Sequence, residues 1–139
     1  MFDPVFGRGH EVSSFVARRL GFARGFDDCA AIGFGDPIVA GVVYHNWNPE
    51  AGTIELSAAS SRRDWLNKRN LGVIFEYPFR QLGCQMCVAR IAEGNSVARR
   101  IWRALGADEF VIPRLRGRGE GEAIYTLTQE AWDERKPNG

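Results

Sequence analysis

The sequence predicts an α/β (α+β) fold in which helices flank a mixed central β-sheet. Three observations favour this fold. Residues 38–47 form an almost continuous apolar stretch, which is typical of a strand covered on both faces. A turn and an alternating strand follow it, as in a hairpin of antiparallel strands. Further on, two amphipathic helices enclose a short apolar strand at residues 84–91, and such crossovers produce parallel neighbours.

The N-terminal half is expected to hold one helix and three strands. Residues 10–20 place their apolar side chains at helical spacing, and Gly21 and Gly25 then end the pattern. The strands are expected at residues 28–34, 38–47 and 53–59, with turns at residues 35–37 and 48–52. Residues 1–9 show no clear periodicity, so we expect them to be poorly ordered.

The C-terminal half is expected to continue as helix, strand, helix and two strands. Pro78 lies inside the first helix, residues 70–83, and should kink it because proline has no amide hydrogen. The remaining elements are a strand at residues 84–91, a helix from about Asn95 to Leu105, and strands at residues 109–112 and 123–128. Residues 130–139 are polar and expected to fray. We expect a single domain spanning residues 1–139.

Composition and charge exclude several classes of protein. The chain is 45% hydrophobic and 25% charged, with a net charge of +1, which gives no electrostatic reason to expect nucleic acid. No apolar run approaches the roughly 20 residues that span a bilayer, and the N-terminus lacks the layout of a signal peptide. Three cysteines do not suggest a disulfide framework. A cytoplasmic location is therefore expected, the host cytoplasm if a phage encodes the chain.

Two segments resemble motifs of the GCN5-related N-acetyltransferase (GNAT) family. In that family the last helix carries an Asn, a small residue three positions later, an aromatic residue seven positions later, and then Leu-Gly-Phe. The chain has Asn95, Ala98, Trp102 and Leu105-Gly106-Ala107 at those positions. The family also has an Arg-x-x-Gly-x-Gly/Ala loop before its central helix, and residues 69–74 match it in part. The order of elements between residues 38 and 127 is similar as well.

The resemblance implies a fold and a cofactor. GNAT proteins bind acetyl-CoA or another acyl-CoA between two splayed parallel strands, here those ending near Ala59 and starting near Cys84. They hold its pyrophosphate at the start of the helix after the loop, where backbone N–H groups and the helix dipole favour anions. The residues implied in cofactor binding are Ser57, Ala58, Ala59, Arg69, Asn70, Leu71, Gly72, Val73, Asn95 and Trp102.

Three positions differ from the family pattern. Ile74 stands where relatives have Gly or Ala, Ala107 replaces a Phe, and Trp102 replaces a Tyr that protonates the departing thiolate in many members. An indole N–H cannot act as that acid. The segments YPFRQLGCQM and IPRLRGRGEGE resemble small GNAT-like proteins of phages and prophages. An inactive protein-interaction module of phage or prophage origin is therefore the alternative to an enzyme.

Glu55 is the candidate general base. Transfer of an acyl group to an amine needs a group that takes the amine proton, and a strand glutamate can do so directly or through water. Strand alternation alone also generates such a residue, with Thr53 and Ser57 on the same face. His45 on the neighbouring strand is a candidate substrate contact, because histidine titrates nearest neutrality, although a lone strand histidine is more often a packed residue.

The last candidate substrate contact is Arg116. Arg116 lies in an arginine-rich loop that could recognise a phosphate or carboxylate of the acceptor, or could simply be solvated beside two glutamates. Cys84 and Cys87 point to opposite faces of a strand, so we expect no disulfide and no metal site.

The favoured hypothesis is an acyl-CoA-dependent N-acyltransferase that moves an acetyl group to an amine-bearing small molecule or protein. The chain is expected to be a monomer or homodimer, without nucleic acid or membrane as partner.

Overall fold

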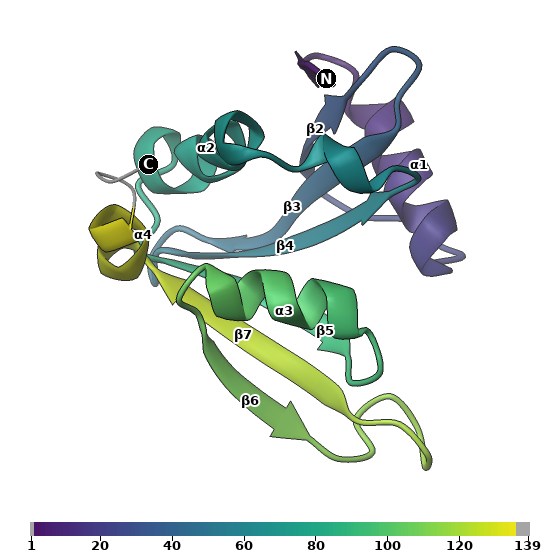
Figure 1. The fold of residues 1–139 in the computed structure, drawn as a ribbon, viewed down its shortest axis with the longest axis vertical. Coiled ribbons are helices and arrows are strands. Elements are labelled where there is room, and N and C mark those ends of the chain that lie inside the picture. The colour runs from purple at the N-terminus through teal and green to yellow at the C-terminus, as the bar shows by residue number, and fades with distance from the viewer. Residues whose placement is uncertain (1, 136–139) are drawn as a thin grey trace.

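A seven-stranded mixed sheet forms the centre of the molecule (Figure 1). The computed structural model describes residues 2–135, and its strands follow the order β1-β2-β3-β4-β5-β7-β6. The strands are β1 (Pro4–Val5), β2 (Ala30–Phe34), β3 (Ala40–Asn48), β4 (Thr53–Ser60), β5 (Met86–Ala92), β6 (Asp108–Ile112) and β7 (Glu122–Thr128). Neighbours are antiparallel except β4 and β5, which are parallel. The predicted mixed α/β fold is confirmed.

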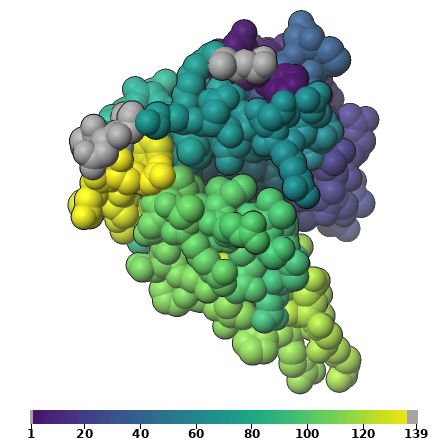
Figure 2. Space-filling model, in the orientation of Figure 1, coloured from purple at the N-terminus to yellow at the C-terminus, as the bar shows by residue number. Residues whose placement is uncertain are grey.

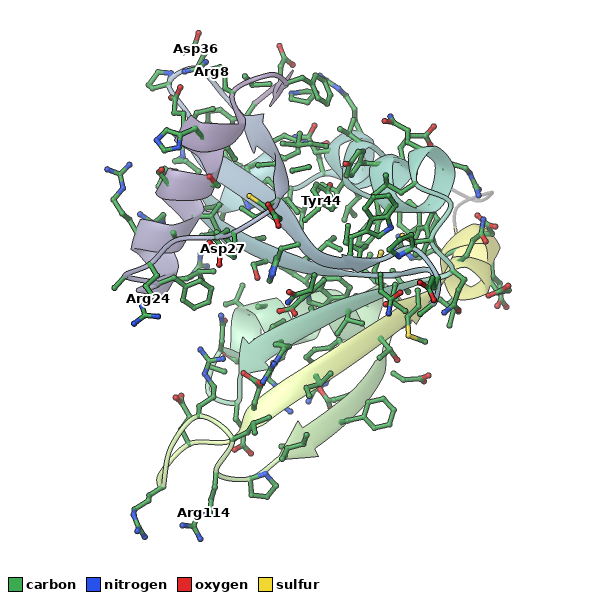
Figure 3. All side chains as sticks on the ribbon, turned by 180° about the vertical axis from the view of Figure 1, so that it is seen from behind. Arg8, Arg24, Asp27, Asp36, Tyr44 and Arg114 are labelled. Atoms are coloured by element: carbon green, nitrogen blue, oxygen red, sulfur yellow. The ribbon has the colours of Figure 1, made fainter. Side chains whose placement is uncertain are left out.

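Helices cover the two faces of the sheet unequally (Figure 1). They are α1 (Gly9–Leu20), α2 (Lys68–Glu76), α3 (Ser96–Ala104) and α4 (Gln129–Arg135). α1 packs on the N-terminal half of one face, while α2 and α3 lie on the other face. Figure 3 shows the face of the sheet that carries α1. The helix covers this face over β2 and β3, and no helix covers it over β6 and β7.

Close packing of α1 on the sheet depends on a glycine. A Cβ atom at Gly41 would lie 2.6 Å from Cγ1 of Val12 and 2.9 Å from Cγ2 of Val16. Both valines are fully buried. The absence of a side chain in β3 thus lets the apolar face of α1 rest on the strand backbone, which makes this half of the molecule tightly packed.

The core lies mainly between the sheet and α2. Its largest fully buried side chains include Tyr44, Phe34, Phe75 and Phe79. Burial of aromatic side chains of this size supplies much of the driving force for folding. Among residues 2–135, no helix is long and apolar enough to cross a membrane.

The kink predicted at Pro78 takes the form of a wider turn. α2 ends at Glu76, and Tyr77–Gln81 continue it as a π-helix in which Leu82 N donates to Tyr77 O. Such turns accommodate a residue that cannot complete the regular hydrogen-bond ladder. Proline is that residue here, since it offers no donor.

Segments near both ends of the chain differ from the sequence-based expectation. Pro4–Val5, expected to be poorly ordered, pair with Gly33 and Phe34 as β1. Residues 130–135, expected to fray, form α4 together with Gln129, and Trp132 of this helix is buried against Phe75 at 4.8 Å between ring centroids. The buried tryptophan and an ion pair between Asp133 and Arg80 dock this short polar helix. Met1 and residues 136–139, also expected to be poorly ordered, lie outside the described residues.

Candidate active site

The parallel strands β4 and β5 separate after three paired positions. Thr53 pairs with Met86, Ile54 with Cys87, and Glu55 with Val88, and the register stops there. Beyond that point β4 stays paired with β3 as far as Ser60, and β5 stays paired with β7 as far as Ala92. The sheet therefore divides after Glu55 into two arms, one ending in β4 and the other beginning with β5, and we call this point the fork (Figure 1). The splay expected between two parallel strands is confirmed.

Polar side chains gather at the point of the fork, on the face that α1 covers. Glu55 lies opposite His45 in the β3–β4 register, and Oε2 of Glu55 is 3.7 Å from Nε2 of His45. The same Nε2 lies 2.9 Å from Oγ of Ser57. Both the glutamate and the histidine are mostly buried, with 15% and 13% of their side chains exposed. The structure thus brings together three residues that the sequence singled out separately.

A β-bulge adds a fourth residue, Asn46, which the sequence analysis missed. The β3–β4 register shifts between His45 and Asn48, and Asn46 takes a positive φ of 53°. Asparagine tolerates this conformation better than most residues. Its Nδ2 donates to Oε1 of Glu55 at 2.9 Å, which fixes the carboxylate. The feature of the sequence that could have revealed this bulge is an asparagine inside a mostly apolar strand, because asparagine is disfavoured in a regular strand.

His45 is held in an environment that favours its neutral form. Burial lowers the pKa of His45, and the nearby charge of Glu55 opposes this shift without reversing it. Part of the covering comes from Phe26, in the loop after α1, whose ring centroid is 5.0 Å from that of the imidazole. A neutral imidazole next to a carboxylate can accept a proton or pass one on.

The helix whose start is expected to bind the pyrophosphate begins two residues earlier than predicted. α2 begins at Lys68, with the side chain of Asn67 accepting from Asn70 N at 2.9 Å. Arg69 therefore lies in the first turn of α2 and not in a loop before it, and Gly72 lies in the second turn. Arg69 Nη1 donates to Oδ1 of Asp3 at 2.9 Å. Leu71 and Val73 are half-buried.

Asn70 serves the packing of this helix. It is fully buried, and its Nδ2 donates to Phe2 O at 2.9 Å and to Trp65 O at 2.7 Å. Its Oδ1 has no hydrogen-bond partner among residues 2–135. The side chain thus ties α2 to the preceding connection and to the N-terminal segment. Ile74, where the family has a smaller residue, is buried in the core.

The opposite arm of the fork carries α3. Asn95 is the N-cap of this helix, and its Oδ1 accepts from Ala98 N at 3.2 Å. Trp102 packs between α2 and β7, with its ring 5.9 Å from that of Phe75 and 6.5 Å from that of Tyr125, centroid to centroid. In the space-filling view, side chains of α3 lie directly below those of the β4–α2 segment (Figure 2). Ala58, in β4 beyond the fork, is exposed, and Ala59 is half-buried.

Tyr125 is the phenol nearest to Trp102 in this packing, and it is engaged elsewhere. Its hydroxyl donates to Glu109 and accepts from Nε of Arg99 at 3.0 Å. Burial, and then the hydrogen bond to Glu109, raise the pKa of Tyr125. Hydrogen bonds from Arg103 and from Tyr125 lower the pKa of Glu109 to about 2. The cluster anchors α3 to β6 and β7.

Arg116 is not brought to the fork. Its Nη1 donates to Oε2 of Glu122 at 2.6 Å, and Arg90 binds the other oxygen of the same buried carboxylate. Glu122 pairs with Ala92 at the far end of β5 and β7. Two arginines on a buried carboxylate form a structural cluster that closes the β6–β7 loop. Cys84 and Cys87 are buried and free, and no group of metal-binding residues occurs within residues 2–135.

No protein-family profile and no curated protein matches the sequence. Solved structures do match the fold. A GCN5-related N-acetyltransferase from Brucella melitensis superimposes with a TM-score of 0.67 at 15% identity, over 89% of this chain and 62% of that one. The protein yncA from Salmonella typhimurium, assigned as an acetyltransferase and solved with its cofactor acetyl-CoA, gives 0.68 at 14% identity, over 91% and 93% of the two chains.

A mutant form of the spermidine/spermine N-acetyltransferase SpeG from Vibrio cholerae gives a TM-score of 0.67 at 12% identity, over 86% of this chain and 76% of that one. Identities this low establish the fold alone. The TM-scores and coverages show that most of this chain shares its overall fold with these structures. The chain has the fold of the GCN5-related N-acetyltransferases.

Proposed function

We propose that this chain is an acyl-CoA-dependent N-acyltransferase that moves an acetyl group from acetyl-CoA to an amine by direct transfer. The observation that carries the proposal is the position of Glu55: a carboxylate fixed by Asn46 and next to His45 stands at the point where β4 and β5 part. General-base catalysis needs such a group within hydrogen-bond reach of the attacking nitrogen.

The residues around the fork fit an acyl-CoA. Beyond the Glu55–Val88 pair, the facing edges of β4 and β5 are not paired with each other, so their backbone groups are available to the amides of an extended ligand. Ser57, Ala58 and Ala59 lie on this edge of β4. The first turn of α2 offers backbone N–H groups and positive potential to phosphates. Bound there, acetyl-CoA would supply the activated acetyl thioester.

The chain's own residues then have distinct roles. Glu55 takes the proton of the acceptor amine, directly or through water, as the nitrogen forms a bond to the acetyl carbonyl carbon. Asn46 and His45 orient the carboxylate, and His45 and Ser57 line the acceptor side. The carbon–sulfur bond breaks, and the CoA thiolate takes a proton from solvent. Neither Trp102, an indole, nor Tyr125, whose proton is directed to Glu109, supplies it.

The test has a binding part and a chemical part. CoA at millimolar concentration should raise the melting temperature of the wild-type protein, because a ligand selective for the folded state stabilises it. With a panel of amines, acetyl-CoA should be converted to CoA, measured by chromatography because exposed Cys29 would react with thiol reagents. Glu55→Gln should lower the rate at least 10²-fold while CoA binding persists. Glu50→Gln, in the exposed β3–β4 turn, is the matched control.

A second candidate is a GNAT-fold interaction module without catalysis, for instance of phage or prophage origin. Trp102 in place of the expected tyrosine favours it. This candidate predicts no melting shift with CoA and no difference between Glu55→Gln and Glu50→Gln. Binding of CoA together with amine-dependent acetyl transfer would exclude it.

A further inference from the structure

Strand β6 is an exposed edge of the sheet with an apolar surface. It pairs with β7 on one side only, and in Figure 1 no element runs along its other side. Three consecutive side chains of this strand are exposed: Phe110 at 54%, Val111 at 41% and Ile112 at 40%. An edge strand also presents unpaired backbone N–H and C=O groups. Apolar edges of this kind pair readily with another strand.

The opposite edge of the same sheet lacks these features. β1 is two residues long and begins with Pro4, which has no amide hydrogen to offer. β6 has five residues, with no proline or lysine among them. The contrast within one sheet indicates that the β6 edge is left open rather than protected.

The residues of β6 are self-complementary in one antiparallel register. Two identical edges related by a two-fold axis perpendicular to the sheet must place some residue opposite its own copy. With Val111 at the axis, Phe110 of each copy lies opposite Ile112 of the other, an aromatic residue against a β-branched one. With Phe110 at the axis, Glu109 would face Val111. With Glu109 at the axis, two carboxylates would meet.

Charges at the ends of β6 support the Val111 register. It brings Asp108 of one copy toward the turn that follows β6 in the other copy, where Arg114 lies, at both ends of the interface. Both residues are exposed, and within residues 2–135 neither forms a side-chain hydrogen bond or ion pair. Arg114 takes a positive φ of 68° in the turn after β6, and its side chain projects outward from the molecule (Figure 3).

We propose that two copies of this chain associate through their β6 edges, antiparallel and centred on Val111, so that the two sheets join into one. The occupant of the exposed edge is thus a second copy, because the strand matches itself in both apolar pattern and charge. The proposal does not depend on the proposed enzymatic function.

Sedimentation over a concentration range tests the association. We expect the wild-type full chain to form dimers as its concentration rises into the micromolar range. Val111→Lys should abolish the dimer, because it places two ammonium groups at the axis. Val97→Lys, on the exposed surface of α3, should leave it unchanged. A wild-type chain that stays monomeric to several hundred micromolar, or a dimer that survives Val111→Lys, would overturn the proposal.

Two further variants test the register itself. Residues opposite each other in antiparallel strands have Cα atoms about 4.5–5.5 Å apart, which suits a disulfide. In a Cys29→Ser background, Val111→Cys should give a cross-linked dimer on mild oxidation, and Val97→Cys should not. Asp108→Arg and Arg114→Asp should each weaken the dimer, and the double variant should restore it. Failure of the double variant to restore it, in a chain whose circular dichroism is unchanged, would contradict the register.

Discussion

The hydroxyl of Tyr44 donates a hydrogen bond to the main-chain carbonyl of Ile74, at 2.6 Å. In a regular helix that carbonyl would accept from the residue four positions later, which is Pro78 and has no amide hydrogen. A buried side chain of β3 thus satisfies the carbonyl that the proline leaves free in α2. This hydrogen bond therefore links the sheet to the helix just before its widened turn.

Tyr44→Phe should therefore cost about 1–3 kcal/mol of unfolding free energy, because it leaves a buried carbonyl unpaired. Tyr77→Phe is the matched control. Its ring contacts that of Tyr44 at 4.9 Å, but its hydroxyl forms no hydrogen bond within residues 2–135. Urea unfolding of the two variants measures the difference. Equal losses would show that the hydroxyl of Tyr44 does not matter to stability.

The buried histidine at the fork should make stability depend on pH. Burial lowers the pKa of His45 in the folded chain, so below about pH 6.5 the unfolded chain takes up a proton first. The stability associated with neutral His45 is then fully present above pH 6.5 and is lost as the pH falls toward the folded pKa. Urea midpoints between pH 7.5 and 5 should fall less steeply for His45→Gln than for wild type. His10→Gln, at an exposed position, should keep the wild-type slope.

The carboxylate that anchors α3 should control stability at more acid pH. Hydrogen bonds from Arg103 and Tyr125 lower the pKa of Glu109 to about 2. The stability that ionised Glu109 contributes is present above about pH 4.3, the ordinary pKa of a glutamate, and is lost as the pH falls through the folded pKa. Glu109→Gln should flatten the decline in stability between pH 4.5 and 2, whereas Glu50→Gln should not. Thermal unfolding followed by circular dichroism across this range would show it.

The sheet and most of its order could be predicted from local patterns. β3 is apolar from Ala40 to Tyr44, where both faces are covered, and β4 alternates because its faces differ, so hydrophobic periodicity identifies each. The fork followed from the resemblance to a family. α4 and β1 could not be predicted, since one tryptophan in a polar segment and a two-residue strand carry no periodicity. Both exist because of distant contacts, with Phe75 and with β2.

The candidate site was predictable only in part, for a similar reason. Glu55 and His45 were identifiable as polar residues on strand faces, but their proximity follows from the register of β3 and β4, which turn geometry sets. The role of Asn46 depends on a bulge that periodicity does not reveal. Arg116 was a reasonable candidate until its partner, Glu122, became visible in the folded chain.

Two glycine-to-alanine changes should have opposite effects on stability. Gly41→Ala places a methyl group 2.6 Å from Val12 and should cost about 1–3 kcal/mol, because α1 must move away from β3. Gly72→Ala, inside α2, meets no atom within 4 Å and should add about 0.5–1 kcal/mol by removing a flexible residue from a helix. Urea unfolding of both variants measures these changes.

The same pair of variants tests where CoA binds. If phosphates approach the backbone of α2, as we propose, the methyl group of Gly72→Ala should weaken CoA binding about tenfold, or about 1.4 kcal/mol, in a protein that is itself more stable. Gly41→Ala should change CoA affinity less, because its added methyl group is directed at Val12 and Val16 of α1. Isothermal titration with CoA separates the two effects. An unchanged affinity in Gly72→Ala would place the phosphates elsewhere than on this turn of α2.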